Sequence, residues 1–111
     1  MPNPPERPAV LREVTPDVLA EVRGLVAAAR HGTLGTLDPA DGYPTTSRVN
    51  LLIGPGGIPL TFISALAAHT MALHADPRCS LFVGEVGKGD PVAHPRVALK
   101  CQAEWLPTTD A

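Results

Sequence analysis

The sequence predicts a mainly β, α+β fold in which short antiparallel strands curl into a small barrel and two helices accompany them. Three observations predict this fold class. The 111 residues include 13 Pro and 10 Gly, which favours short elements joined by tight turns. Short apolar segments recur between those turns, and short connections favour antiparallel neighbours. A chain of this length forms one domain with its own core.

The first predicted element is a helix that follows a Pro-rich stretch. Residues 1–14 show no apolar period, and we expect them to form an arm. The Thr-Pro-Asp run at 15–17 is typical of a helix start, because Thr caps, Pro suits the first turn and Asp suits the positive end of the dipole. Apolar residues then recur at helical spacing. The sequence therefore predicts a helix over 16–31, with Arg30 and His31 in its last turn.

Five strands and a second helix are predicted after this helix. The last strand is the clearest, because Val97, Leu99 and Cys101 alternate with polar residues. An Ala-rich segment before an Asp-Pro pair predicts a short helix over 65–75. A Gly-rich loop over 84–95 precedes the last strand, and loops of that length are usually functional or mobile. The predicted strands cover residues 33–37, 45–53, 58–64, 79–83 and 96–105.

Composition excludes several classes of protein. The formal net charge is −2, so no basic excess suggests a nucleic-acid or anionic-membrane partner. No apolar run approaches the roughly 18 residues of a membrane span, and the first residues do not resemble a signal peptide. We therefore expect a cytoplasmic protein with a small-molecule substrate. Cys79 and Cys101 lack metal-ligand spacing, so we expect a reduced, buried pair and no metal site.

Arg48 is the first candidate binding residue, because it lies within the apolar strand predicted over 45–53. Strand alternation puts Arg48 and Asn50 on one face and Val49 on the other. An Arg among apolar residues is costly unless it has an anionic partner, and its forked guanidinium suits phosphate or carboxylate. The alternative is an exposed Arg on the solvent side of the strand.

The junction between the third predicted strand and the short helix, residues 64–70, is the second candidate. Its small residues allow a ligand near the backbone, and a helix start offers free N–H groups that suit phosphate. Ser64 and Thr70 add hydroxyls, and His69 adds a side chain that becomes cationic when protonated. The alternative is an ordinary N-cap with an Ala-rich packing face.

The sequence contains none of the common catalytic motifs. The Gly-Lys pair of the 84–95 loop is not a P-loop, because the glycine spacing and the following Ser or Thr are missing. GxGxxG, GxSxG and HExxH are also absent. A covalent or metal-dependent hydrolase is therefore not favoured, and no catalytic residue is predicted. We expect His31 and His74 to lie at helix ends, with capping roles only.

Two long segments together resemble a known family. They are ARHGTLGTLDPADGYPTTSRVN and LTFISALAAHTMALHADPRCSLFVGEVGKGDPVAHPRVALKCQAEW, and the resemblance covers about residues 16–105. They resemble the FMN-binding split-barrel superfamily of pyridoxamine-phosphate-oxidase-like proteins, and within it the haem-utilisation (HugZ-type) branch. The most specific pieces are ARHGTL, SRVN, SALAAHT with DPRCSL, and GKGDPVAHPR.

The resemblance implies an antiparallel split β-barrel over residues 15–111 that holds FMN at the interface of a homodimer. In the family, an Arg-led strand segment contacts the flavin, and a later pair grips its phosphate. Five recognisable strands also stop about one short of such a barrel, so we expect the domain to lack its C-terminal end. Together with Lys88 of the loop, the residues at the flavin-contacting positions are Arg48, Val49, Asn50, Ile63, Ser64, His69, Thr70 and Arg96.

Departures from the family pattern argue against a true pyridoxine-phosphate oxidase. The Lys that holds the substrate phosphate is replaced by Ile53, and the Arg-Lys pair that grips the FMN phosphate is replaced by His69 and Thr70. The family's C-terminal substrate-binding Arg and Ser fall beyond residue 111. The further C-terminal domain of the haem-utilisation proteins is also outside these residues.

Three hypotheses follow for the function. The first is an FMN-dependent oxidoreductase, with Arg48, Ser64, His69, Thr70 and Lys88 around the phosphate and ribityl chain. The second is a haem-binding or haem-utilisation-related protein on the same fold, in which each of the four His is a possible axial ligand. The third is a non-catalytic protein that binds flavin or only dimerises.

Overall fold

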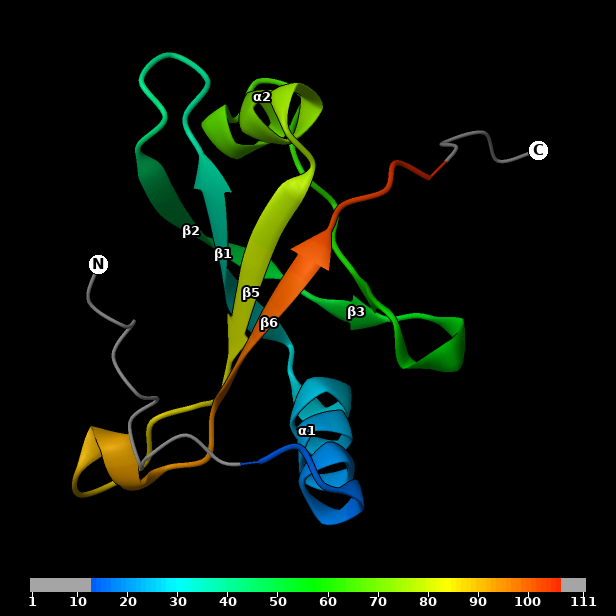
Figure 1. The fold of residues 1–111 in the computed structure, drawn as a ribbon, viewed down its shortest axis with the longest axis vertical. Helices are drawn as coiled ribbons and strands as arrows, with labels where there is room; N and C mark the ends of the chain where they lie inside the picture. Colours follow the sequence, from blue (N-terminus) through cyan, green and yellow to red (C-terminus); the bar gives the residue numbers. More distant parts are fainter. Residues whose placement is uncertain (1–12, 107–111) are drawn as a thin grey trace, which may run out of the picture.

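The computed structural model describes residues 13–106, so most of the expected arm lies outside the described residues. Strands β2-β1-β5-β6 form one antiparallel sheet in that order, and β3 pairs with β4 apart from it (Figure 1). The mainly antiparallel fold class with two helices is confirmed, but the sheet does not close into a barrel. The elements are α1 Pro16–Ala28, β1 His31–Leu37, β2 Pro44–Asn50, β3 Leu52–Ile53, β4 Pro59–Leu60, α2 Ala68–Ala75, β5 Arg78–Val83 and β6 Val97–Gln102.

Helix α1 begins where the sequence predicts it. The hydroxyl of Thr15 accepts a hydrogen bond from the N–H of Val18 at 3.2 Å, and Pro16 occupies the first turn. The helix ends at Ala28 rather than at residue 31, because the chain from His31 onward pairs with β2. The expectation that His31 lies in a helix end is therefore wrong.

Gly32 explains why β1 begins so close to the helix. A Cβ atom on Gly32 would lie 3.0 Å from the carbonyl oxygen of Phe82 and 3.1 Å from side-chain atoms of Leu51 and Leu81. A larger residue would push these core neighbours apart. The absence of a side chain at Gly32 therefore allows β1 to pack against the core directly after the helix.

The single strand predicted over 45–53 is two strands in the structure. β2 ends at Asn50, and the N–H of the buried Leu51 donates to the carbonyl of Arg30 at 2.8 Å. The chain then enters β3, which pairs only with β4. This change of partner leaves β2 at the edge of the larger sheet, which is why the sheet stays open. The strand predicted over 58–64 is limited to Pro59–Leu60, because β3 is only two residues long.

Helix α2 is shorter than predicted at its N-terminal end. Ser64 first forms a turn, because its carbonyl accepts from the N–H of Ala67 and its hydroxyl accepts from the N–H of Leu66. The helix therefore begins at Ala68 rather than at residue 65. No helix within residues 13–106 is long and apolar enough to cross a membrane.

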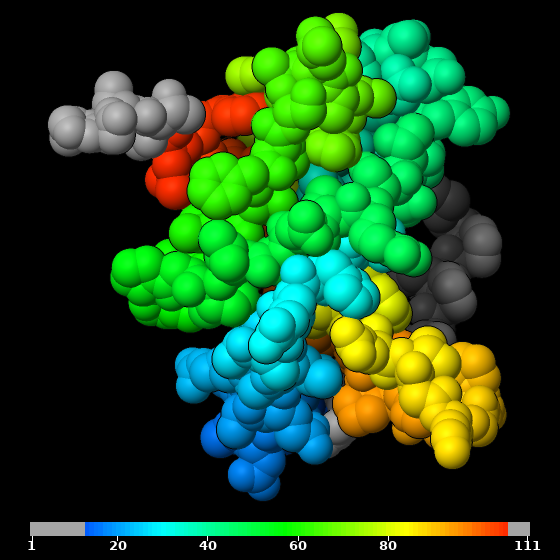
Figure 2. Space-filling model, turned by 180° about the vertical axis from the view of Figure 1, so that it is seen from behind, coloured from blue at the N-terminus to red at the C-terminus, as the bar shows by residue number. Residues whose placement is uncertain are grey.

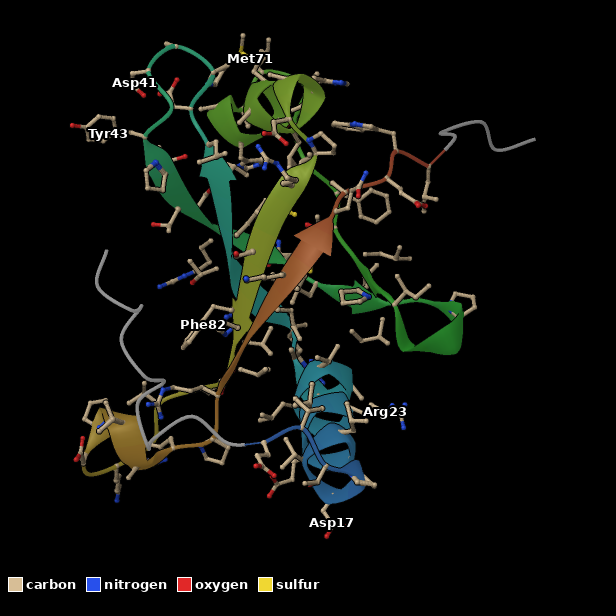
Figure 3. All side chains as sticks on the ribbon, in the orientation of Figure 1. Asp17, Arg23, Asp41, Tyr43, Met71 and Phe82 are labelled. Carbon is tan, nitrogen blue, oxygen red and sulfur yellow. The ribbon has the colours of Figure 1, made fainter. Side chains whose placement is uncertain are left out.

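One apolar cluster joins both helices to the inner face of the larger sheet. Val26 of α1 and Leu73 of α2 belong to it, together with buried residues of β1, β2 and β5. The predicted alternation of β6 is confirmed, since Val97 and Leu99 pack against this cluster. On the outer face, the labelled side chain of Phe82 points away from the core and is 41% exposed (Figure 3).

Candidate functional site

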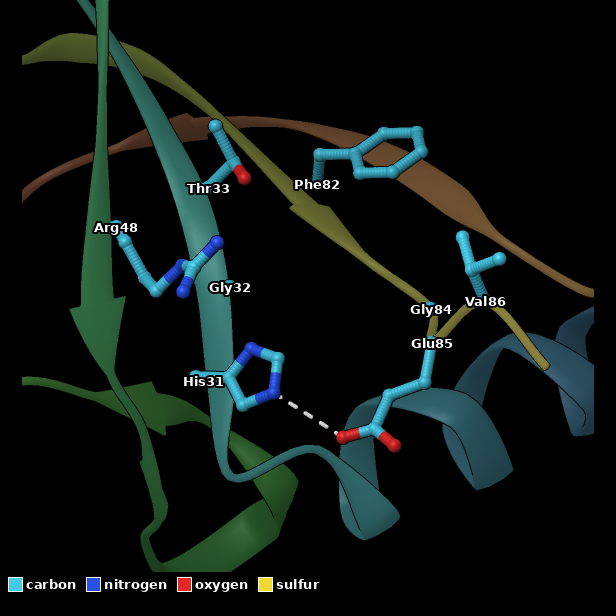
Figure 4. A pocket seen from close by; sticks show the side chains of 8 residues that line it. All are labelled: His31, Gly32, Thr33, Arg48, Phe82, Gly84, Glu85 and Val86. Carbon is cyan, nitrogen blue, oxygen red and sulfur yellow. Dashed lines mark hydrogen bonds and ion pairs between the residues drawn. The ribbon is translucent and has the colours of Figure 1, made fainter. Parts of the chain in front are cut away.

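A hollow of about 380 Å³ lies where β1, β2 and the end of β5 meet the 84–96 loop (Figure 4). The sheet register builds it, because Thr33 lies opposite Arg48 in β2 and opposite Phe82 in β5. These three side chains form one row on the outer face. The lining residues are His31, Gly32, Thr33, Arg48, Phe82, Gly84, Glu85 and Val86.

Arg48 takes the position that strand alternation predicts. It is exposed together with Asn50, while Val49 between them is 6% exposed and belongs to the core. Among residues 13–106, no side chain or carbonyl bonds to the Arg48 guanidinium. Figure 4 shows the guanidinium extending over β1 in the direction of the His31 ring. The hollow thus contains one unpaired cation.

The loop that follows β5 supplies a carboxylate to the same hollow. Nε2 of His31 lies 3.1 Å from Oε1 of Glu85, and the two side chains are 48% and 78% exposed. Figure 2 shows the start of this loop, in yellow, beside the β1 start, in cyan. Gly84 makes the loop entry possible, because its φ is +137° and a Cβ there would lie 2.6 Å from the carbonyl oxygen of Pro95.

The strand-to-helix junction forms a separate polar cluster on the inner side of β2. Nδ1 of His69 lies 3.1 Å from the hydroxyl of Ser47, whereas Nε2 is buried and makes no hydrogen bond. The hydroxyl of Thr70 donates to the carbonyl of Ser64, and Thr70 is 3% exposed. Arg48 therefore lies on the outer face of β2, whereas His69 contacts its inner face. The two side chains do not share one site within a single chain.

Lys88 and Arg96, the two predicted site residues in the 84–96 loop, lie far from the strand-to-helix junction. The 84–96 loop and α2 are at opposite ends of the larger sheet (Figures 1 and 2). The carbonyl of Lys88 accepts from Nε2 of His94 at 2.8 Å, and Arg96 donates to the carbonyl of Val92 at 2.7 Å. The Arg96 side chain thus stabilises its own loop. Ile63 packs against the apolar core.

Sequence reasoning named His31 only as one of four possible haem ligands and expected it at a helix end, and it missed Phe82 and Glu85 as site residues. A His-Gly-Thr alternation at the start of β1 was the available signal for His31, since the outward positions of a strand share one face. Nothing local marks Phe82 or Glu85, because they reach the hollow only through the pairing of β5 with β1. His74 does lie in the last turn of α2, where it stacks on Trp105 with ring centroids 4.1 Å apart.

The two cysteines lie opposite each other in β5 and β6 and are free thiols. They are half-buried rather than fully buried. Burial raises the pKa of the Cys79 thiol and, to a smaller degree, so does the neighbouring Cys101; burial also raises the pKa of Cys101. Within residues 13–106, no group of three or more His, Cys, Asp or Glu is placed to hold a metal ion.

Comparison with known proteins relates most of this chain to one family. A family model described as pyridoxamine 5'-phosphate oxidase matches residues 18–111. The chloroplastic haem oxygenase HOZ of Arabidopsis thaliana is 36% identical over 64 residues, which are 57% of this chain and 20% of that protein. The chain thus spans about a fifth of this curated relative.

Solved structures show the same fold. A haem-binding protein from Mycobacterium smegmatis superposes with a TM-score of 0.74 and 35% identity, over 88% of this chain and 40% of that one. The haem storage protein HutZ from Vibrio cholerae superposes with a TM-score of 0.67 over 83% of this chain and 64% of that one, at 22% identity. The second likeness concerns the fold alone.

Proposed function

The chain belongs to the pyridoxamine 5'-phosphate oxidase family, and from this premise we propose that it is a haem-binding protein of the haem-utilisation branch. The observation that carries this choice concerns His69 and Thr70, which replace the pair that grips the FMN phosphate in the oxidases. Thr70 is 3% exposed and its hydroxyl donates to the Ser64 carbonyl, while Nδ1 of His69 is engaged by Ser47. A phosphate at this point would have to displace both contacts, which disfavours FMN.

The named relatives support the same choice. Two relatives above 30% identity, from Arabidopsis thaliana and Mycobacterium smegmatis, are a haem oxygenase and a haem-binding protein by name, and a third, from Agrobacterium tumefaciens at 32%, is of unknown function. Because this chain spans 20% and 40% of the first two, the proposal covers binding of haem and not a complete reaction.

The residues of the outer hollow fit one wall of a haem site. Phe82 and Val86 offer apolar surface to a porphyrin ring, Arg48 offers a cation to a propionate, and His31 contributes an imidazole in the same hollow. A ligand at His31 would have to displace only its largely exposed pair with Glu85, whereas His69 is turned inward, His74 stacks on a Trp and His94 binds a carbonyl of its own loop. Bound haem would supply one-electron and oxygen chemistry through its iron.

An FMN-dependent oxidoreductase is the second candidate. The unpaired guanidinium of Arg48 favours it, because Arg48 heads the segment that contacts flavin in the oxidases. A site that used both Arg48 and His69 would need a second copy of the chain, since the two residues belong to opposite faces of β2. In this candidate the protein is a homodimer that acts on a small-molecule substrate.

Parallel titrations of the 111-residue protein with hemin and with FMN test the proposal. We expect hemin to give a shifted Soret band that saturates near one equivalent, and FMN fluorescence to remain unquenched. Arg48→Ala should weaken hemin binding, whereas Arg78→Ala should not, because Arg78 is already paired with Asp76 at 2.7 Å. A yellow protein that releases FMN, or an unshifted Soret band, would refute the haem proposal.

A further inference from the structure

Two thiols face each other across neighbouring strands of the larger sheet. Cys79 of β5 lies directly opposite Cys101 of β6 in the register. Strand alternation turns both side chains to the inner face, where they pack against the apolar cluster. Both are free and half-buried. The fold thus holds two thiols side by side, which is the first requirement of a disulfide within one chain.

A hydrogen bond just beyond the two strands defines the kind of position that the thiols occupy. The N–H of Ala103 donates to the carbonyl of Pro77 at 2.8 Å, and these two residues continue the register of β5 with β6. Hydrogen-bonded and non-hydrogen-bonded pairs alternate along an antiparallel ladder. Since Pro77 and Ala103 are a hydrogen-bonded pair, Cys79 and Cys101, two residues along each strand, are one as well.

The geometry of a hydrogen-bonded pair allows a disulfide but strains it. Opposed Cα atoms in such a pair are about 5.5 Å apart, which lies within the range of natural disulfides. Their Cβ atoms are also about 5.5 Å apart, whereas a relaxed disulfide needs about 3.8 Å. Closing the bond between Cys79 and Cys101 therefore draws the two strands together locally. Strain of this kind makes a disulfide easier to reduce.

A second hollow gives a small oxidant access to the pair. It has a volume of about 740 Å³, lies at the end of the sheet where β1 and β6 end, and is lined by both cysteines. Lys100 also lines it and offers a cation to the carboxylates of an anionic oxidant such as glutathione disulfide. The hollow therefore suits a low-molecular-weight disulfide that carries negative charge.

We propose that Cys79 and Cys101 are the site of a reversible intrachain disulfide, formed with a low-molecular-weight disulfide such as glutathione disulfide as the oxidant. One cysteine thiolate attacks the oxidant, so that a protein–glutathione S–S bond forms, the oxidant's own S–S bond breaks and one glutathione leaves. The second thiolate attacks the protein sulfur of this mixed disulfide and releases the second glutathione. The two thiol protons and two electrons of the protein end on the two glutathiones.

The site is independent of haem or flavin binding and acts on the sheet itself. Among residues 13–106, β6 pairs with β5 alone and is an edge strand (Figure 1). The disulfide ties this edge strand covalently to its neighbour. Because burial raises the pKa of both thiols, the thiolates that carry out both steps are scarce at neutral pH, and oxidation accelerates as the pH rises.

Oxidation of the reduced 111-residue protein to equilibrium in glutathione buffers at pH 8 tests the proposal. Intact mass, measured after the remaining thiols are blocked, distinguishes an intrachain disulfide from a mixed disulfide and from a cross-linked dimer. We expect the intrachain disulfide without retained glutathione, and its full reversal by excess reduced glutathione. Cys79→Ser and Cys101→Ser should each stop at the mixed disulfide.

Two matched variants test the register and the strain. Cys101→Ser combined with Lys100→Cys keeps two thiols but puts them on opposite faces, so no intrachain disulfide should form. Ser80 lies opposite Lys100 in a non-hydrogen-bonded pair, where Cβ atoms are closer. In a chain with Cys79→Ser and Cys101→Ser, the changes Ser80→Cys and Lys100→Cys should give an equilibrium constant for oxidation at least about tenfold larger than that of the parent.

Three results would overturn the proposal. One is a folded parent protein that only retains glutathione, only cross-links between chains, or stays reduced until urea is added. Another is an intrachain disulfide in the variant with Cys101→Ser and Lys100→Cys, because chain mobility and not the register would then bring the thiols together. The third is an equilibrium constant for the pair at 80 and 100 that is no larger than that of the parent, because the parent pair would then be unstrained.

Discussion

Replacement of Gly84 by Ala should be among the most damaging single changes in this protein. Two costs add at this position. A residue with a side chain is strained at φ of +137°, by roughly 1–3 kcal/mol. Its Cβ would also lie 2.6 Å from the Pro95 carbonyl oxygen and 2.7 Å from the Arg96 Cα, and relieving such overpacking costs about 1–3 kcal/mol more. We therefore expect a loss of about 2–6 kcal/mol in the free energy of unfolding.

Two other glycines separate these costs. Gly89 has φ of +89°, but a Cβ added there would have nothing within 4 Å, so Gly89→Ala should lose only about 1–2 kcal/mol through backbone strain. Gly24 lies in α1 at an exposed position with open space around it, so Gly24→Ala should gain about 0.5–1 kcal/mol. The expected order of stability is therefore Gly24→Ala, then Gly89→Ala, then Gly84→Ala. Only the first of these variants should be more stable than the parent protein.

Urea unfolding, followed by circular dichroism and by the fluorescence of Trp105, measures this order. A Gly84→Ala chain that is unfolded without urea agrees with the upper end of the range, because small domains have only about 5–15 kcal/mol of stability. If Gly84→Ala and Gly89→Ala had the same midpoint, the close approach of the loop to β6 would be refuted. Loss of the Gly84 turn should also separate Glu85 from His31.

Three further predictions concern the core and the thiols. Val83→Ala should lower the free energy of unfolding by about 2 kcal/mol, because Val83 is 1% exposed. Val92 is 64% exposed, so Val92→Ala should change it by under about 0.5 kcal/mol. Equal losses in the two variants would contradict the placement of the core. Because burial raises the pKa of Cys79 and Cys101, both thiols should alkylate more slowly at pH 8 in the folded protein than in urea. The neutral thiols contribute fully to stability below pH 9, the ordinary pKa of a thiol. As the pH rises further this contribution is lost, because the unfolded chain releases these protons at a lower pH than the folded protein does. An increase in stability from pH 9 to 10 would refute this.

Local chemistry in the sequence determined where many elements begin and which way their residues face. The Thr-Pro-Asp run at 15–17 starts α1 because a cap and a fixed φ act within one turn. The alternation of β6 gives the inner and outer faces of that strand, and the same rule places Arg48 outside. The family motifs were also recognisable without structure, since they are runs of neighbouring residues.

Pairing between distant segments was decided only by the tertiary structure. His31 belongs to a strand rather than a helix end because seven residues of β1 find partners in β2, which outweighs one more helical turn. The strand over 45–53 divides at Leu51 because that residue is buried and bonds to Arg30, a contact that spacing along the chain does not reveal.

The candidate site shows the same division. Sequence alternation determined that Arg48 is outward, but not that His69 bonds to the opposite side of β2, so the two were expected around one phosphate. Phe82 and Glu85 lie near Arg48 because β5, which follows α2 in the chain, pairs with β1 in the sheet. Local propensity acts over a few residues, whereas strand register depends on the packing of the whole core, and that packing decides which side chains share a site.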